Sequence, residues 1–331
     1  MQKKISIGVA VYNGQQTLAR AIESLINQTY TNLEIIIIDD FSLDNSREII
    51  KRYADRDSRI KFKINKTNKG LIYNFNELFE TSSGEYFMWS DQDDVRENTF
   101  IDKAQKILEN NPKSVLCHSE TKVFFENIKN ILHINSMSKI SKKNNIVSRY
   151  KKLLWYYNDT NIYGLIRSSA LKKTSLWNKM NGSSNNLLFQ LILIGKFEYI
   201  DEPLFLYSGK EITERPSIRD EYKILTKYKS PFFYYAGLIL LKNQFMSILK
   251  SKINIFNKFK IVYFLFEHFL LTNFSKFLFR IFYKKEDNSI NNIILKICIF
   301  LFPINSEVKI IVDESKYPKY FPKFSQYRKF K

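Results

Sequence analysis

The first 125 residues alternate short, continuously apolar segments with segments in which apolar residues recur every three or four positions. The continuous segments have the length of strands and are Ile5–Val11 and Leu33–Ile38; further strands are predicted at Ile60–Ile64, Tyr86–Trp89 and Val115–His118. Such segments are typical of strands covered on both faces of a parallel sheet. The periodic segments predict helices around Leu18–Ile26, Ile49–Tyr53, Phe75–Phe79 and Phe100–Leu108. This alternation predicts a doubly wound α/β sheet, which binds ligands at the carboxyl ends of its strands.

The pattern beyond residue 125 is less regular. Residues 126–150 are rich in Asn, Lys and Ser, which predicts a surface excursion. From about Tyr222 the pattern turns helical and basic. We therefore expect an α/β domain over residues 1–221, with halves at 1–125 and 126–221, followed by a helical basic region over 222–331. The elements expected between these regions are a strand at Tyr163–Ile166, a helix from Ser168, a helix at Leu187–Ile194 ended by Gly195, and edge strands at 197–200 and 204–207.

Acidic residues directly follow two of the predicted strands. Asp39-Asp40 comes after Leu33–Ile38, and the segment Asp91–Asp94 comes after Tyr86–Trp89. In a doubly wound sheet both groups lie at the ligand-binding edge. Adjacent carboxylates repel one another, and their hard oxygens suit Mg²⁺ or Mn²⁺ shared with a phosphate group. A simpler interpretation is that these carboxylates cap helices or solvate loops; it explains either group alone better than it explains both together.

Glycine-rich nucleotide motifs are absent from the sequence. Neither GxGxxG nor GxxxxGK[ST] occurs, so the dinucleotide-binding and P-loop classes lose their main support. The remaining possibility is a site that uses carboxylates for a base and ribose and a metal ion for a diphosphate.

The order and spacing of these segments resemble a family 2 glycosyltransferase of the GT-A fold. The matching segments are Ile5–Val11, Tyr12-Asn13, Ser24 to Gln28-Thr29, Glu34–Asp40 with Ser42 and Asp44, Asn68-x-Gly70, Gly84-Glu85-Tyr86 and Asp91–Asp94, with weaker likeness at Tyr163–Arg167 and Leu187–Leu206. The resemblance covers roughly residues 4–125. Two residues depart from the family pattern: Ala10 stands where Pro is usual, and Phe41 stands where Gly is common.

The resemblance implies an inverting, metal-dependent hexosyltransferase with a nucleotide-diphospho-sugar donor, UDP-linked by expectation, and a glycan or polyisoprenyl-linked acceptor. It implies that Mn²⁺ or Mg²⁺ lies at Asp91 and Asp93 and stabilises the charge that develops on the departing diphosphate. The residues that it assigns to nucleotide-sugar binding are Tyr12, Asn13, Asp39, Asp40, Asn68 and Asp91.

The catalytic base does not follow from the resemblance. The family usually places an Asp near the start of a later helix, and matching Leu187-Leu188 to that helix puts Ser184 at this position. Serine does not accept a proton near neutral pH. Either another carboxylate serves, with Asp159 and Asp201 as the candidates by sequence position, or the protein is a weak or inactive transferase that acts in binding or assembly.

The positive charge is concentrated near the C-terminus. The chain carries 52 Lys and Arg against 33 Asp and Glu, a net charge of +19. Residues 229–331 hold 18 basic and 6 acidic residues, an excess of 12, and 17 of the 28 Phe. Basic and aromatic residues together are typical of segments that lie on an anionic membrane surface. A helical cap with a solvated lysine face is the simpler interpretation.

Location and competing classes follow from the remaining features. Cys117 and Cys298 form no CxxC spacing, and no apolar segment is long enough to span a bilayer with confidence, so we expect a cytoplasmic protein at the inner face of the membrane. His118 and His133 have no second ligand at metal-binding spacing, so we expect each to lie in the core or on the surface and not to bind a metal. We expect Arg167 either to contact a phosphate or to be a solvated charge beside a helix. A nucleic-acid-binding protein is the remote alternative, because the charge fits but no recognition motif is present.

Overall fold

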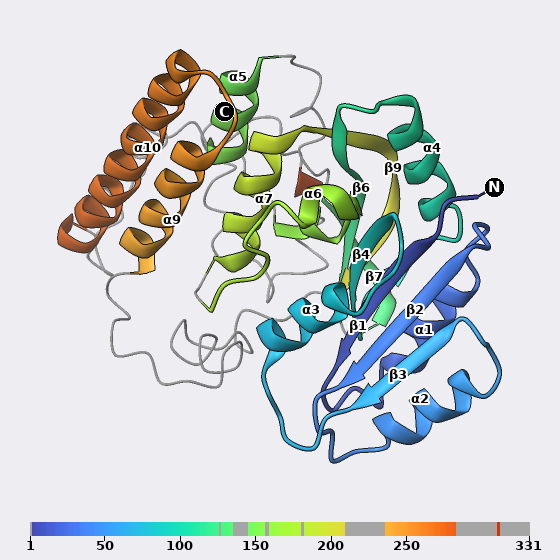
Figure 1. The fold of residues 1–331 in the computed structure, drawn as a ribbon. Coiled ribbons are helices and arrows are strands. Elements are labelled where there is room, and N and C mark those ends of the chain that lie inside the picture. Colours follow the sequence, from blue (N-terminus) through green and yellow to red (C-terminus); the bar gives the residue numbers. More distant parts are fainter. Residues whose placement is uncertain are drawn as a thin grey trace.

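The computed structural model describes residues 2–125, 127–134, 145–155, 159–179, 182–208, 236–282 and 310–311 (Figure 1). The strands are β1 (Ile5–Val11), β2 (Leu33–Asp39), β3 (Ile60–Ile64), β4 (Tyr86–Asp91), β5 (Val95–Arg96), β6 (Ser114–Phe125), β7 (Asn127–Ile134), β8 (Leu165–Arg167), β9 (Lys196–Ser208) and β10 (Ile310–Ile311). The helices are α1 (Leu18–Ile26), α2 (Ser46–Ala54), α3 (Leu71–Glu80), α4 (Phe100–Asn110), α5 (Ile146–Trp155), the 3₁₀ helix η1 (Asp159–Tyr163), α6 (Ser168–Leu171), α7 (Ser183–Ile194), α9 (Ala236–Lys250) and α10 (Ile255–Phe282).

All these strands belong to one sheet, with β10, β7, β6, β8, β4, β1, β2 and β3 side by side in that order. β1 lies between β2 and β4, and β1 to β4 run parallel, as the continuous apolar segments predict. Beyond β4 the sheet becomes mixed, because β8 is antiparallel to both β4 and β6 and β7 is antiparallel to β6. β9 runs parallel to β6 and also pairs with the short β5.

The side chains of the central strands alternate between two cores. On β2, Ile35 and Ile37 pack with α1, α2 and α4, whereas Ile36 and Ile38 pack on the face that α3 covers. Helices therefore cover both faces of the sheet, with α1 and α2 on one side and α3 and α7 on the other (Figure 1). This arrangement confirms the predicted doubly wound α/β class. It also explains why the strands carry no polar face.

The aromatic strand β4 is buried. Phe87 and Trp89 are fully buried on the face of α3, and the Trp89 indole N–H donates to the Phe75 carbonyl oxygen at 2.9 Å. The rings of Phe75 and Trp177 complete this cluster, with centroids 4.8 Å apart. The aromatic residues therefore serve the core.

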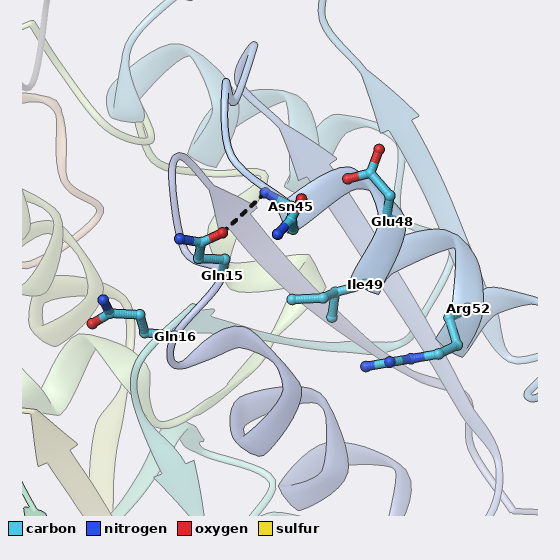
Figure 2. A pocket seen from close by; sticks show the side chains of 6 residues that line it. All are labelled: Gln15, Gln16, Asn45, Glu48, Ile49 and Arg52. Carbon is cyan, nitrogen blue, oxygen red and sulfur yellow. Dashed lines mark hydrogen bonds between the residues drawn. The ribbon is translucent and has the colours of Figure 1, made fainter.

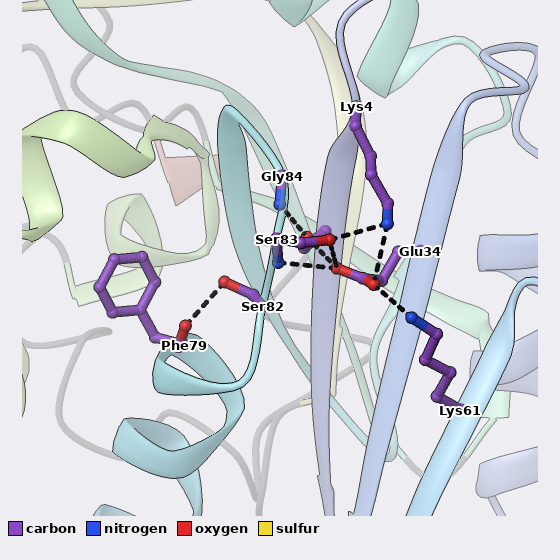
Figure 3. Close-up of polar contacts among 8 residues, drawn as sticks. Lys4, Glu34, Lys61, Phe79, Ser82, Ser83 and Gly84 are labelled. Atoms are coloured by element: carbon purple, nitrogen blue, oxygen red, sulfur yellow. Dashed lines mark hydrogen bonds and ion pairs between the residues drawn. The ribbon is translucent and has the colours of Figure 1, made fainter.

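A buried carboxylate joins the strands at the amino edge of the sheet (Figure 3). Glu34, near the start of β2, accepts hydrogen bonds from Lys4 at 3.0 Å and Lys61 at 2.9 Å. It also accepts from the Ser6 hydroxyl on β1 and from the backbone N–H of Ser83, just before β4. Burial acts to raise the pKa of Glu34, but these donors outweigh burial and lower the pKa below its ordinary value of 4.5. Glu34 thus holds four neighbouring chain segments in register.

The sequence predicts some elements closely and others only in part. β1 and β3 have the predicted bounds, and α7 ends at Gly195 as expected. The edge strands expected at 197–200 and 204–207 are one strand, β9, with an irregular register between them. In the expected excursion at 126–150, β7 and the start of α5 are regular structure, and residues 135–144 lie outside the described part of the chain.

The described part of the basic region expected at 222–331 consists of α9, the turn after it, α10 and the short strand β10; the other residues of the region lie outside the description. Ile248 of α9 and Ile261 and Leu265 of α10 are buried in the same core cluster as α5 and α7. In Figure 1 the pair lies at the outer side of α7 and α5. No helix in the described ranges is both long and apolar enough to cross a membrane.

Candidate functional site

The carboxyl ends of the central strands bring the acidic residues to one edge of the sheet. In the strand register, Val11 of β1 lies opposite Asp39 of β2, and Ala10 lies opposite Asp91 of β4. Both acidic groups therefore flank the end of β1, at the edge where a doubly wound sheet binds ligands.

The loop after β1 is tied to the loop after β2. The backbone N–H of Asn13 donates to the Ser42 hydroxyl at 3.0 Å, and the Asn13 side-chain oxygen accepts from the Leu43 N–H at 2.9 Å. Asn13 has a positive φ of 50°, which Asn tolerates better than most residues. Tyr12 beside it is 47% exposed. The tight loop leaves the Tyr12 ring available at the rim of the site.

Asp39 is fully buried with one oxygen engaged. Its Oδ1 accepts from the Ser42 N–H at 3.0 Å and from Arg47 Nε at 3.2 Å, while Oδ2 has no hydrogen-bond partner in the described part of the chain. The Arg47 guanidinium also lies over the Phe41 ring, 5.2 Å from its centroid. A buried carboxylate oxygen without a donor is costly, so this site accommodates a hydrogen-bond donor.

Phe41 adopts a left-handed backbone, with φ at 67°. At this position, Gly is common in the family that the sequence resembles. A bulky residue in this region stores about 1–3 kcal/mol of strain. The loop therefore keeps the glycine-like conformation although the side chain has changed.

Asp40 shapes the loop before α3. Its carboxylate accepts from the backbone N–H of Lys69 at 2.6 Å and of Gly70 at 2.8 Å, and from the Asn65 side chain at 3.1 Å. The Asn68 side-chain oxygen also accepts from the Gly70 N–H, at 3.1 Å. Asp40 and Asn68 thus fix the backbone of this loop, which borders the edge of the sheet beside Asp39.

The loop after β4 is clamped to the loop after β1 by Gln92. The Tyr12 N–H donates to Gln92 Oε1 at 2.8 Å, and Gln92 Nε2 donates to the Tyr12 carbonyl at 3.1 Å. Gly14 leaves room for this amide, because a Cβ there would lie 2.6 Å from Gln92 Oε1. From α1, Arg20 donates to the Asp93 carbonyl at 3.3 Å.

Two tyrosines surround the acidic loop. The Tyr163 hydroxyl, at the end of η1, donates to Asp91 Oδ2 at 2.6 Å. Burial, then the charge of Asp91, raises the pKa of both Tyr163 and Tyr207. Both phenols therefore stay protonated, and Tyr163 acts as a donor toward Asp91.

The buried pair Asp94 and Arg96 lies beneath the loop. Asp94 Oδ1 accepts from the Ser208 N–H at 3.0 Å, while its Oδ2 is buried without a partner in the described residues. Burial, followed by the charges of Asp91 and Asp93, raises the pKa of Asp94. Arg96 donates to the Tyr163 carbonyl at 2.7 Å and lies 3.5 Å from the Phe205 ring centroid. The pair joins β5, the end of β9 and η1 under the site.

The candidate bases lie in different surroundings. Asp159 is exposed at the start of η1, the element whose other end contacts Asp91, and its charge acts on Tyr207 together with those of the acidic loop. Asp201 is exposed at the irregularity of β9, next to Glu202, which pairs with Lys103 of α4. The first turn of α7, which contains Ser184, holds no acidic residue. Asp159 therefore lies near the acidic loop, whereas Asp201 lies on the side of α4.

A separate hollow lies between the start of α1 and α2 (Figure 2). It has a volume of about 570 Å³ and is lined by Gln15, Gln16, Asn45, Glu48, Ile49 and Arg52. None of the sequence-predicted site residues lines it. The hollow borders the loop after β1 without belonging to the acidic edge.

The donor set fits a cation that is shared with a substrate. In the part of the chain that the structure describes, no three His, Cys, Asp or Glu side chains are grouped to hold a metal ion by themselves. Asp91 and Asp93 supply carboxylate oxygens from one loop, and one oxygen of Asp91 is already bonded to Tyr163. Mg²⁺ is commonly held by one or two carboxylates together with substrate phosphates and water. The residues present therefore fit a diphosphate-bound cation.

Comparisons with known proteins agree with this architecture. Residues 6–174 match the family described as Glycosyl transferase family 2. The chain is 28% identical over 218 residues to glycosyltransferase GlyA of Streptococcus pneumoniae. This alignment covers 63% of this chain and 29% of that protein. It is 39% identical over 107 residues to the putative glycosyltransferase EpsE of Bacillus subtilis, 32% of this chain and 38% of that protein. The matches thus span about a third of the length of these relatives.

The structural comparison concerns the fold. The crystal structure of S. aureus TarS 1-349 superposes with a TM-score of 0.62 at 17% identity, covering 91% of this chain and 81% of that chain. The likeness shows the GT-A fold. The family match covers residues 6–174, just over half of the 331 residues of the chain. The chain therefore belongs to glycosyltransferase family 2.

Sequence reasoning missed Gln92, Arg20, Arg47 and Arg96 as parts of this edge, whereas Asp94 belongs to the acidic segment that the sequence places there. Arg167, considered as a phosphate contact, instead donates to the carbonyls of Ser114 and Leu108 and to the Tyr86 hydroxyl. It therefore lies at the start of β4, away from the carboxyl edge, and its half-buried guanidinium binds backbone carbonyls instead of phosphate. The short distance between Asp94 and Arg96 in the sequence is the one available signal, since buried charges need partners.

Proposed function

We propose that the protein transfers a hexosyl group from a nucleotide-diphospho-sugar, UDP-linked, to a hydroxyl of a glycan or lipid-linked acceptor. The convergence of Asp39 with Asp91 and Asp93 around the end of β1 carries this proposal. A uracil N–H is the kind of donor that the unpartnered oxygen of Asp39 needs. The S. aureus TarS structures with UDP and with UDP-GlcNAc support the choice of donor, on the same fold.

In this proposal the nucleoside lies against the loops after β1, β2 and β3. Asp39 accepts from the base, and Tyr12, partly exposed at the rim, contacts the nucleoside with its ring. Asn13, Asp40 and Asn68 act mainly by fixing the backbone that borders the nucleoside, because their side-chain oxygens bond to loop N–H groups. Asp91 contacts the ribose and the cation.

Asp91 and Asp93 would hold Mn²⁺ or Mg²⁺ together with the donor diphosphate. When bound, the cation stabilises negative charge on the departing nucleoside diphosphate. Tyr163 holds Asp91 in place through its hydroxyl, and Arg20 holds the backbone of Asp93. These contacts orient the carboxylates before the donor binds.

The acceptor hydroxyl is activated by Asp159. In an inverting transfer, the oxygen of the acceptor hydroxyl bonds to the anomeric carbon of the donor as the bond from that carbon to the diphosphate breaks. The proton of the acceptor hydroxyl passes to the Asp159 carboxylate. Asp159 is exposed to an incoming acceptor and lies near the acidic loop through η1.

Calorimetry with UDP, with and without MnCl₂, tests the donor site. Asp93→Ala should weaken binding in the presence of metal, and Asp39→Asn should weaken it in both conditions. Glu48→Gln, an exposed carboxylate in the neighbouring hollow, is the matched control and should bind like the wild type. No UDP binding by folded wild-type protein in either condition contradicts the proposal.

The second candidate function is a binding or assembly protein of the same family with little or no turnover. The absence of an acidic residue from the first turn of α7 favours it. Release of UDP from a panel of UDP-sugars, with and without acceptors, separates the two functions. UDP binding without turnover for any donor, and activity gained by Ser184→Asp, would support the second.

A further inference from the structure

The outer faces of α9 and α10 expose a large apolar surface. The exposed large apolar residues of this helix-pair surface are Leu238, Ile239, Met246, Leu249, Ile255, Phe256, Phe259, Tyr263, Phe266 and Leu270. The most exposed among them are Phe256 at 76% and Phe259 at 68%. A group of exposed large apolar residues of this kind marks an interaction site in a folded protein.

The exposed residues of α10 recur every three or four positions from Phe256 to Leu270 and so lie along one side of the helix. The opposite side of α10 carries Ile261 and Leu265, which are 1% and 2% exposed in the core beside α7. The helix is therefore apolar on both sides, and in the part of the chain that the structure describes only one side packs in the core.

Exposed basic residues accompany the helix-pair surface. Lys242, Lys250, Lys252 and Lys260 are exposed on the same two helices or on the turn between them. The segment 236–282 contains seven Lys and Arg and a single acidic residue, Glu267, which gives a net charge of +6. The natural partner of such a surface offers both apolar and anionic groups.

The charge decides between the occupants. A second copy of the chain would bring another +6 segment against the first, and like charges facing each other are unfavourable. A bilayer with anionic headgroups offers acyl chains for the phenyl rings and phosphates for the lysines. Insertion across the bilayer is not in question, because no described helix is suited to span it.

We propose that the helix-pair surface lies flat on an anionic lipid bilayer, with the rings of Phe256, Phe259 and Tyr263 at the acyl boundary and the flanking lysines at the headgroups. This contact does not depend on donor binding. It holds the protein at a surface where acceptors carried on lipid are within reach.

Sedimentation of the full chain with vesicles tests the proposal. We expect binding to phosphatidylcholine vesicles that contain phosphatidylglycerol, and at least tenfold weaker binding to pure phosphatidylcholine or at 0.5 M salt. The triple variant Phe256→Ser/Phe259→Ser/Tyr263→Ser should lose at least tenfold in affinity. The matched control Phe62→Ser/Tyr73→Ser changes residues that are 41% and 40% exposed elsewhere, and it should bind like the wild type.

Circular dichroism and UDP calorimetry on the triple variant show whether fold and donor binding are kept. As an independent readout, the emission of Phe259→Trp should shift to the blue on anionic vesicles, relative to the wild type, whereas that of Phe62→Trp should not. Equal vesicle binding by the folded triple variant and the wild type overturns the proposal. So does a wild type that binds no vesicles but is dimeric in ultracentrifugation, with a monomeric triple variant.

Discussion

The side-chain amide of Gln92 pairs with the backbone of Tyr12 through both its oxygen and its nitrogen. It joins the loop that presents the Tyr12 ring to the loop that presents Asp91 and Asp93. Because each hydrogen bond contributes about 1 kcal/mol net, the clamp is strong enough to order both loops before a ligand arrives.

Replacing Gln92 therefore tests the ordering of the site. Gln92→Leu should weaken UDP binding in MnCl₂ about five- to tenfold, because both hydrogen bonds to Tyr12 are lost. Gln92→Glu keeps the acceptor for the Tyr12 N–H but loses the donor to the Tyr12 carbonyl. In the absence of metal, its affinity for UDP should therefore lie between those of the wild type and Gln92→Leu. Calorimetry provides the measurement. Gln16→Leu, at an exposed glutamine of the loop after β1 that lies outside the clamp between Gln92 and Tyr12, is the control and should be neutral.

The two candidate bases, Asp159 and Asp201, can be told apart by the effect of each on kcat. Asp159→Asn should lower kcat by about 10²–10⁴ while leaving UDP binding intact, since the amide cannot accept the acceptor proton. Asp201→Asn, exposed beside α4, should keep kcat within about twofold of the wild type. Steady-state kinetics with a donor and acceptor that turn over decide between them. Full activity in Asp159→Asn would remove it from the mechanism.

Among the elements, the strands at the amino edge depend on Glu34. Glu34→Gln keeps the shape but removes the charge that Lys4 and Lys61 meet, so we expect a loss of about 1–3 kcal/mol in the free energy of unfolding. Urea denaturation measures it. Asp102→Asn, whose partner Lys106 is 69% exposed on α4, should cost no more than about 0.5 kcal/mol.

Acid should reproduce the loss in part. Because the folded-state pKa of Glu34 is lowered, its contribution to stability is complete above the ordinary pKa of 4.5 and declines as the pH falls below it. The difference in unfolding free energy between the wild type and Glu34→Gln should therefore shrink below pH 4.5. A difference that stays constant with pH would assign the loss to packing.

His118 of β6 makes the free energy of unfolding depend on pH in a different range from Glu34. It is buried against Tyr199 of β9, with ring centroids 5.2 Å apart, and burial lowers its pKa from 6.5 to about 4. The unfolded chain binds this proton first, so stability should fall by up to about 3 kcal/mol between pH 6.5 and pH 4. His118→Gln should flatten the unfolding free energy over this range. The buried position agrees with a structural histidine; the side chain of His133 lies outside the description.

The sequence predicts these elements unevenly, for physical reasons. β1 is buried on both faces and α1 along one face, so their apolar pattern defines their bounds. β6 runs on past His118 to Phe125, because the polar positions 119–122 interrupt its apolar pattern before Val123. The acidic edge follows from strand order, because parallel strands end together. The Gln92 clamp does not follow from sequence, because an amide can bond any nearby backbone and only the loop geometry selects Tyr12.

At the scale of the whole molecule, α9 and α10 share a core with the α/β domain. Leu265 and Leu270 both lie on α10, but Leu265 is 2% exposed and Leu270 is 63% exposed. Leu265→Ala should lower the free energy of unfolding by about 2–5 kcal/mol, whereas Leu270→Ala should be nearly neutral. Thermal unfolding should show one transition that shifts as a unit in Leu265→Ala. A separate early transition would mean that the helix pair unfolds by itself.

The position of Glu34 also has a consequence for engineering. The register of β1 to β4 is fixed at the amino edge, at the end of the sheet opposite the loops that meet the donor. Libraries that randomise the exposed or half-buried segment 66–69 or position 41 should therefore yield a high fraction of expressible proteins, because strand alignment does not depend on those loops. Libraries that include positions 6, 34 or 83 should yield mostly aggregates. The molecule thus separates the part of its sequence open to diversification from the part that must stay constant.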